Sequence, residues 1–355
     1  MFQYSIEHVD PATVHEDLLR MWSDNLPVES MAAEAKYQWT YVDAPRRPEG
    51  VFVLAVRDGD GESHPVGTAG LGTRTFYANG RPLEAGLLAD LAVDKAHRTA
   101  LPAIRLIREV RRRALSRFDL SYGYPNQSAE GVFLRCGYRK LGTMGRYAAV
   151  LRHAPFVRRV VDLPVLPRLA GAVLDGARLG QALPRSLHAA HGYRLLWLDQ
   201  VDGRFDDLWL HAHNAYTLIG TRDAAFLRWR FLGHPTQRFR VAALVERTAH
   251  HTLHAYAVVE RDDRAAYLRD LFGHPEALPP LLDLLLPALR LQRCSSVSFD
   301  FLGSRRVIGL LISRGFEFRE PDRTIIADVG RSRGDLRSLL DDAESWHLTD
   351  ADEDT

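Results

Sequence analysis

Cysteine is scarce in this sequence, whose 355 residues include only Cys136 and Cys294, far apart and without a CxxC partner. A cysteine-based zinc site and a disulfide framework are therefore excluded. One bridge between the two stays open, although reduced thiols in a cytoplasmic protein are the simpler interpretation. His250, His251 and His254 lack acidic partners at metal-ligand spacing, so we expect no metal site.

The sequence also lacks an excess of charge, because 46 Lys and Arg residues face 45 Asp and Glu residues. Binding a nucleic-acid backbone needs a concentrated basic surface, so we expect no nucleic-acid partner. The sequence contains no uncharged apolar run of about 18 residues, which predicts no transmembrane helix. The first ten residues lack the apolar core of a signal peptide, and we expect a cytoplasmic protein.

What the sequence does contain is the composition of a globular protein, with 46% hydrophobic and 26% charged residues. A chain of 355 residues is longer than one hydrophobic core usually serves, which favours two domains.

An internal repeat divides the chain into halves. Three motifs recur in one order, namely Trp-x-aromatic-x-x-x-Pro, Leu-x-Asp-Leu and Gly-aromatic, placed at Trp39 and Trp229, at Asp90 and Asp270, and at Gly137 and Gly315. The aspartate precedes the glycine by 47 positions in the first half and by 45 in the second. Two unrelated α/β domains with coincidental tryptophans are the alternative.

The predicted elements follow the same order in both halves, three strands and then a helix, a strand and a helix. They cover 51–56, 66–75, 83–93, 100–118, 120–124 and 128–136, and then 240–245, 254–260, 266–272, 278–291, 296–301 and 305–314. This layout predicts an α+β (mixed α/β) fold, with a mixed, mostly antiparallel sheet flanked by helices in each half. We expect domains at 1–154 and 193–355, joined by a linker over 155–192 that carries a helix from 168 to 183.

The stretch from Leu91 to Ala103 reads as the end of a strand, a turn that contains Arg98, and the start of a helix. Free backbone N–H groups at a helix start, together with a nearby arginine, form a site for a pyrophosphate. Asn126 follows the next predicted strand, and a Gly-Tyr pair at Gly137 ends the next helix.

With these features the chain resembles the GNAT superfamily of N-acyltransferases, over nearly its whole length if the repeat is genuine. The resemblance implies two tandem GNAT-like domains and an acyl-CoA donor. The residues that the resemblance assigns to donor binding are Leu91, Ala92, Val93, Arg98, Thr99, Ala100, Leu101, Ala103, Asn126 and Ser128.

The sequence departs from the family pattern at several places. Leu101 replaces the central glycine of the phosphate loop, and Pro102 removes a backbone donor. The tyrosine that serves as general acid in many members is Phe133 in the first half and Leu311 in the second. The second phosphate loop lacks an arginine and carries Glu276, so we expect the first half to bind the donor and the second to be degenerate.

Two aspartates are the catalytic candidates. Asp90, on the strand before the phosphate loop, could orient or deprotonate the amine, or it could simply pair with an arginine of a neighbouring strand. Asp270 is its counterpart, for which a structural use is favoured. Four further side chains are candidates for substrate binding, with core packing or a surface ion pair as the alternative, and they are Trp39, Tyr41, Trp229 and Arg230.

The donor has two candidates. Arginines from Arg105 to Arg117 give the helix over 100–118 a basic face, which is either solvated or a dock for an acidic acyl carrier protein. The weakened phosphate loop favours an acyl carrier protein as the donor, because a carrier-bound phosphopantetheine lacks the adenosine diphosphate that the loop binds.

We therefore predict an N-acyltransferase in which an amine attacks an acyl thioester directly. The acceptor would be an amino sugar, an amino acid or a peptide. The tandem resemblance points to surface-polysaccharide or lipopeptide and secondary-metabolite biosynthesis. A Fem-type aminoacyl-tRNA-dependent transferase and a non-catalytic binding protein of the same fold are the alternatives.

Overall fold

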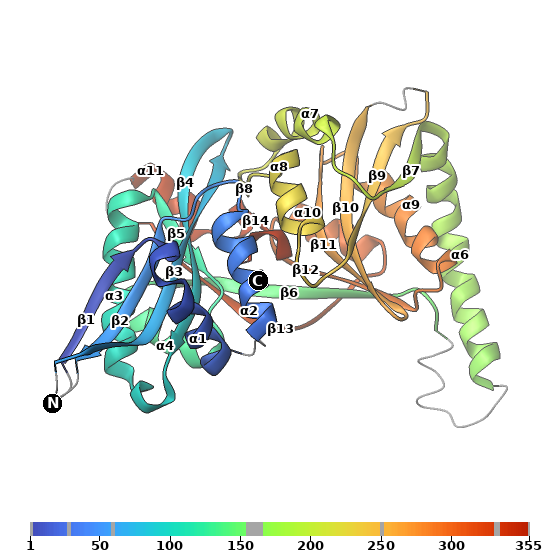
Figure 1. The fold of residues 1–355 in the computed structure, drawn as a ribbon. Helices are drawn as coiled ribbons and strands as arrows, with labels where there is room; N and C mark the ends of the chain where they lie inside the picture. The colour runs from blue at the N-terminus through green and yellow to red at the C-terminus, as the bar shows by residue number, and fades with distance from the viewer. Residues whose placement is uncertain are drawn as a thin grey trace.

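The structure, a computed structural model, describes residues 3–26, 30–57, 61–153, 166–248, 252–329 and 334–353 (Figure 1). The strands of these residues join in one mixed sheet that runs across the molecule, with helices on its faces (Figure 1). The predicted α+β class is confirmed. The halves do not form two separate sheets, however, because strands of one half pair with strands of the other.

In addition to two short 3-10 helices at Pro11–Val14 and Lys95–His97, the described residues of the first half contain six strands, four α-helices and a π-helical turn. They are β1 (Gln3–Val9), α1 (His15–Asn25), α2 (Ser30–Tyr37), a π-helical turn (Gln38–Val42), β2 (Gly50–Arg57), β3 (Ser63–Ala78), β4 (Arg81–Val93), α3 (Ala100–Arg117), β5 (Leu120–Gly123), α4 (Gln127–Arg135) and β6 (Arg139–Val150).

The second half follows a nearly identical order after the long helix α6 (Leu166–Gly192). Its elements are β7 (Tyr193–Leu198), α7 (Gly203–Ala212), β8 (Leu218–Gly220), α8 (Ala224–Leu227), a π-helical turn (Arg228–Leu232), β9 (Phe239–Glu246), β10 (Leu253–Asp262), β11 (Ala265–Gly273), α9 (Leu278–Leu291), β12 (Ser296–Gly303), α10 (Arg305–Ser313) and β13 (Glu317–Asp328). A C-terminal tail adds α11 (Gly334–Asp341) and β14 (Trp346–Leu348).

The predicted helix over 168–183 lies within α6, which extends further at both ends. The remainder of the expected linker up to residue 165 lies outside the described residues, as does most of the histidine cluster at 250 and 251. The domain limits stay a prediction.

The strand order of the sheet is β1-β2-β3-β4-β5-β13-β6-β12-β11-β10-β9-β7. The last strand of the second half, β13, pairs with β5 of the first, where Ile326 is opposite Gly123. The last strand of the first half, β6, pairs with β12 of the second, where Tyr147 is opposite Phe299. Each half thus completes its part of the sheet with a strand from the other half.

The helices beside the sheet form because of their sequence patterns. In α3, buried Leu106, Ile107 and Val110 face the sheet, while arginines occupy the opposite side. In α4 and α10 the helix begins at a capping residue, Asn126 and Ser304 respectively, whose side chain accepts a hydrogen bond from the backbone three residues on. The two caps occupy corresponding places in the two halves.

The C-terminal tail is buried between the halves. Its residues Ala351 and Asp352 are both 0% exposed. Arginines from both halves surround them, as described below.

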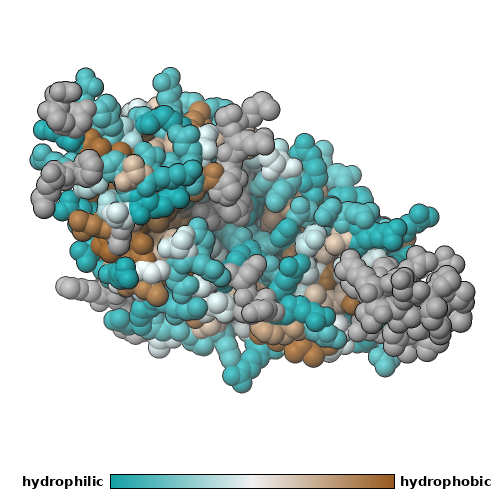
Figure 2. Space-filling view, turned by 90° about the horizontal axis from the view of Figure 1, so that it is seen from below, coloured by the Kyte–Doolittle hydropathy of each residue, from teal (hydrophilic) through white to brown (hydrophobic). Residues whose placement is uncertain are grey.

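The surface seen from below is mostly hydrophilic, and where the atoms are not grey its hydrophobic residues form small separate groups (Figure 2). Among the described residues, no helix combines the length and the apolar character that crossing a membrane requires.

Candidate active site

The candidate site lies where β4 and β5 separate. These parallel strands pair from Ala85 to Leu88 of β4, and the last pair joins Leu88 to Gly123. Beyond this pair the strands diverge and border a cavity of about 260 Å³. Leu91 lines it from β4, and Asn126 lines it from the start of α4.

Asp90 sits at a bulge where the pairing of β4 with β3 shifts register, and its φ of 53° is in the left-handed region. Such a conformation is uncommon for a residue with a side chain, and bulges of this kind redirect side chains. The Asp90 carboxylate lines the cavity and is held by two partners. Lys36 Nζ lies 2.7 Å from Oδ1, and the Tyr41 hydroxyl donates to Oδ2 over 2.8 Å. The sequence offered no signal for Lys36.

Tyr124 is a second cavity residue to which the sequence analysis gave no role. It follows β5 directly, and its hydroxyl is buried without a hydrogen-bond partner among the described residues. Burial raises the pKa of this phenol well above its usual value, and the charge of Asp352 adds to the increase. Tyr124 is therefore a protonated, buried hydroxyl beside Asp90's cavity.

The loop before α3 is braced internally. The Arg98 guanidinium donates to the Val93 carbonyl over 3.2 Å and to Asn25 Oδ1 over 3.1 Å. The Thr99 N–H donates to the His97 carbonyl over 2.7 Å. The first turn of α3 leaves the N–H groups of Ala100 and Leu101 as donors.

The other predicted donor-binding residues occupy varied places. Ala92 and Val93 pair with β3 and are buried, while Ala103 lies in the first turn of α3 after Pro102. Asn126 Oδ1 accepts from the Ala129 N–H over 2.9 Å and from the Ser128 hydroxyl over 2.7 Å. Ser128 does not line the cavity.

The predicted substrate-binding tryptophans meet between the two halves. The rings of Trp39 and Trp229 stack with centroids 5.1 Å apart. Each indole N–H donates to the backbone carbonyl of the other residue, over 2.8 and 2.7 Å. Both tryptophans and Tyr41 border a small cavity of about 40 Å³ next to the β4 residue Ala89.

Arg230 lines neither of these cavities and is 4% exposed, although its guanidinium packs on the Trp39 ring 5.3 Å from the ring centroid. Its guanidinium donates to the backbone carbonyls of Asp350, over 2.7 Å, and Ala351, over 3.3 Å. It thus contacts the C-terminal tail, as does the fully buried Arg222, which binds the Asp352 carboxylate over 2.5 Å. Burial alone would raise the pKa of Asp352, but Arg222 and then Arg74 hold it below its ordinary value.

The corresponding split in the second half is filled. The strands β11 and β12 pair only up to Leu268. Further along, β14 pairs with Leu302 and Gly303 of β12, and the His347 side chain hydrogen-bonds the β11 carbonyl of Leu271 over 3.0 Å. The chain's own tail therefore occupies the space between these two strands.

Asp270 lies in this filled region and is 0% exposed. Its carboxylate accepts from the hydroxyls of Thr349 and Tyr256, each over 2.8 Å, and Arg222 lies 3.5 Å away. It borders none of the cavities described here. Its counterpart Asp90 differs because it faces an open cavity.

The basic face of α3 is partly neutralised. Arg111 pairs with Asp328 over 2.5 Å, Arg112 with Glu109 over 2.5 Å, and Arg117 with Glu49 over 3.4 Å. Arg113 also contacts Glu49. Fewer charges remain for a carrier protein than the sequence suggests. Among the described residues, no group of three or more His, Cys, Asp or Glu side chains is arranged to hold a metal ion.

Solved structures with the same arrangement identify the fold. A conserved protein of unknown function from Enterococcus faecalis V583, described as a probable N-acyltransferase, aligns over 92% of this chain and 73% of its own, with 9% identity and a TM-score of 0.61. A GCN5-related N-acetyltransferase from Kribbella flavida aligns over 92% and 71%, with 15% identity and a TM-score of 0.60.

A third structure, a GCN5-related N-acetyltransferase from Anabaena variabilis ATCC 29413, aligns over 93% and 73%, with 14% identity and a TM-score of 0.59. The chain has the GNAT fold. No protein-family model and no curated protein matches the sequence. The resemblance inferred from short motifs is therefore confirmed at the level of the GNAT fold.

Proposed function

We propose that the chain is an N-acyltransferase that moves an acyl group from a coenzyme A thioester to an amine in the cavity between β4 and β5. The observation that carries this proposal is the contrast between the two halves. The split of the first half opens into a cavity, while β14 fills that of the second. We also propose that the halves are tandem copies of the GNAT fold, supported by their shared element order.

The thioester would lie in the split with its carbonyl against β4. Past Leu88, β4 no longer pairs with β5. Alternate backbone N–H groups from Leu91 to Val93, on the edge of β4 that faces β5, can therefore point into the split. Fixed donors of this kind stabilise the oxyanion that forms when an amine attacks the carbonyl carbon. The N–H groups of Ala100 and Leu101 would bind the pyrophosphate.

Asp90 would hold the incoming ammonium group and accept its proton. The carboxylate is nearly buried and already contacts the Lys36 ammonium, so the position suits a cation. Once neutral, the amine nitrogen forms a bond to the thioester carbon, and the carbon–sulfur bond then breaks. Asp270 has no part in this scheme, because its carboxylate is enclosed by Thr349, Tyr256 and Arg222.

Tyr124 would give its hydroxyl proton to the departing thiolate. Phe133 cannot do so, and Tyr124 is the cavity residue with a free, buried hydroxyl among those described. After the attack the nitrogen loses a second proton, which restores the Tyr124 phenol as the amide forms. The first proton passes from Asp90 to solvent, so the amide, the free thiol and one proton leave the site.

The test is the release of free thiol from acetyl-CoA and longer acyl-CoA substrates with a panel of amino sugars, amino acids and short peptides. We expect Asp90→Asn and Tyr124→Phe each to lower kcat by about 10²- to 10⁴-fold, the usual range for general acid–base groups. Tyr138→Phe is the matched control, since its hydroxyl is buried as that of Tyr124 is, but Tyr138 does not line the cavity. A lack of thioester consumption with every amine would refute the proposal.

Activity with an acyl carrier protein but not with acyl-CoA would mean that the donor is a carrier-bound thioester that reacts at the same site. Activity that depends on aminoacyl-tRNA and is abolished by ribonuclease would favour the Fem-type alternative. Binding of coenzyme A without turnover would favour a non-catalytic protein of this fold.

A further inference from the structure

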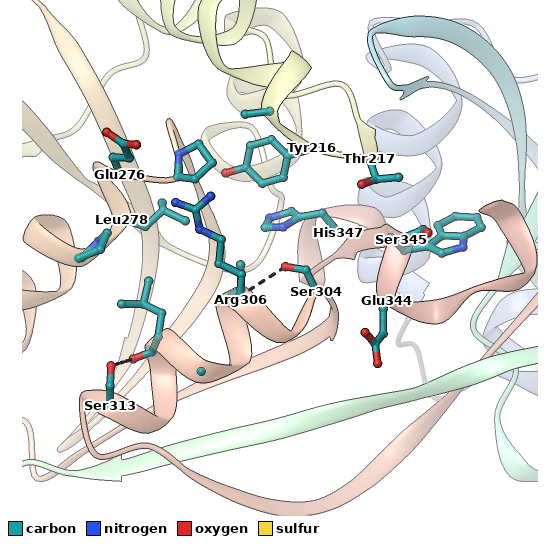
Figure 3. A pocket seen from close by; sticks show the side chains of 17 residues that line it. Tyr216, Thr217, Glu276, Leu278, Ser304, Arg306, Ser313, Glu344, Ser345 and His347 are labelled. Atoms are coloured by element: carbon teal, nitrogen blue, oxygen red, sulfur yellow. Dashed lines mark hydrogen bonds between the residues drawn. The ribbon is translucent and has the colours of Figure 1, made fainter.

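A second cavity, of about 560 Å³, lies in the other half of the molecule beside β14 (Figure 3). Its walls come from the loop between β11 and α9, from α10, from residues 215–217 and from the tail. The acyl transfer proposed above does not use it. A cavity of this size is within the range of small-molecule sites.

One wall of the cavity is aromatic and fixed. Tyr216 stacks on Phe272, and its hydroxyl donates to the Gly273 carbonyl over 2.7 Å. His347 is 2% exposed and packs edge-on against Tyr216. Burial, followed by the charge of Arg222, lowers the pKa of His347 to about 4, so its ring is neutral near pH 7. Leu278 and Val307 add aliphatic surface.

The cavity is not built for a coenzyme pyrophosphate. The loop from β11 leads directly into α9, whose first residue Leu278 is followed by Pro279 and Pro280, which have no N–H group. Glu276 borders the cavity in place of a cation and would repel a phosphate dianion.

Most polar side chains of the cavity already have partners. Glu344 pairs with Arg305 over 2.6 Å, and Ser313 donates to the Leu310 carbonyl over 2.7 Å. Ser304 caps α10. Arg306 differs, because among the described residues its guanidinium has no hydrogen bond or ion pair. Its side chain extends into the cavity on the side of Tyr216 and Leu278 (Figure 3).

We propose that this cavity binds a small monocarboxylate with an apolar body. The carboxylate would pair with Arg306 and the body would lie on Tyr216, His347 and Leu278. An arginine beside an apolar wall suits such a ligand, since it binds a carboxylate in a bidentate manner. Glu276 selects a single negative charge over the two of a phosphate. The site is separate from the donor and acceptor positions proposed above, and it does not depend on them.

Titration calorimetry of the full chain with sodium octanoate tests the proposal. We expect saturable binding that Arg306→Gln weakens by about tenfold or more, the effect of losing one charged hydrogen-bonded partner. Arg319→Gln is the control, since Arg319 is also exposed, pairs with Glu317 over 3.0 Å and does not border the cavity. Octanamide, octylamine and inorganic phosphate should each bind at least tenfold more weakly than octanoate.

Two further measurements separate this site from the first half. Arg98→Ala should leave octanoate binding unchanged, and coenzyme A should not compete with octanoate. The proposal is overturned if octanoate gives no binding heat at millimolar concentration, if Arg306→Gln binds it as well as the parent chain does, or if coenzyme A displaces it. Thermal unfolding of Arg306→Gln should match that of the parent, because Arg306 is an exposed side chain.

Discussion

Two buried histidines, His234 and His347, are uncharged in the folded protein near neutral pH. Burial lowers the pKa of each to about 4, and the charges of Arg230 and Arg222 respectively add to the effect. In His234 the Nδ1 atom accepts from the Gln237 backbone over 3.1 Å, so a proton there would displace this hydrogen bond. The folded protein therefore resists protonation that the unfolded chain accepts.

This difference gives the stability a definite pH dependence. Between pH 6.5 and 4 the unfolded chain binds protons at these histidines and the folded protein does not. The free energy of unfolding should therefore fall as the pH falls through this window, by up to about 3 kcal/mol for each histidine. Urea unfolding at a series of pH values measures it.

His234→Asn keeps an acceptor for the Gln237 N–H but cannot titrate. We expect His234→Asn to make the decrease in the free energy of unfolding between pH 6.5 and 4 smaller than in the parent chain. The same substitution at the exposed His211 should not change this decrease. Equal pH profiles for His234→Asn and the parent would contradict the assignment.

At the scale of elements, the two π-helical turns form one symmetric contact. Trp39 and Trp229 stack and exchange hydrogen bonds through each other's backbone carbonyl. Their contributions to stability should therefore be coupled, because each residue needs the other in both its ring contact and its hydrogen bond.

A double-mutant cycle tests this coupling. We expect Trp39→Phe and Trp229→Phe each to lower the free energy of unfolding by about 1–3 kcal/mol, because each removes part of the ring contact and leaves a part-buried carbonyl without its donor. The double variant should lose less than the sum, with a coupling of about 0.5–3 kcal/mol. Additive losses would show that the two turns act independently. Trp197→Phe, on the edge strand β7, is the control for a tryptophan that is not paired in this way.

Local patterns in the sequence predicted those elements that have a strong local signal. The amphipathic α3 and the strands β2, β4 and β11 match their predicted positions closely, because their patterns depend on their own side chains. The strands β6 and β13 were not predicted, since what places them is pairing with residues far away in the chain.

The same reasoning applies to the site. The Leu-x-Asp-Leu motif located Asp90, because the residue lies on a strand that a local pattern reveals. Lys36 contacts Asp90 from a helix 54 positions earlier in the chain. The contacts of Asp270 with the tail, and the position of Arg306 at its cavity, likewise depend on the tertiary fold. No local feature marks such residues. The second phosphate loop, which lacks an arginine and carries Glu276, suggested that the second half is degenerate, but not that the tail fills its split.

At the scale of the whole molecule, the exchanged strands make each half depend on the other. Residues 1–154 alone would lack β13, which pairs with β5, and residues 155–355 alone would lack β6, which separates β13 from β12. Each fragment would expose unpaired strand edges, which favour aggregation.

Expression of the two fragments tests this dependence. We expect each alone to lack the near-ultraviolet circular dichroism of the full chain or to aggregate, and the two produced together to form a complex of native size on gel filtration. A full chain cleaved between residues 154 and 165 after folding is the control, and it should keep its structure. A folded, monomeric 1–154 fragment would contradict the prediction.

The exchange of strands also sets an order of events during synthesis on the ribosome. The β5 strand ends at Gly123, and its partner β13 begins at Glu317, 194 residues later. At about 5–20 residues per second, the β5 edge waits roughly 10–40 s for its neighbour. The first half is therefore incomplete until β13 has been made, and so is the cavity beside Asp90, because Ile326 of β13 lines it. We expect chaperones that shield unpaired strand edges to raise the yield of the folded chain, because such edges favour aggregation.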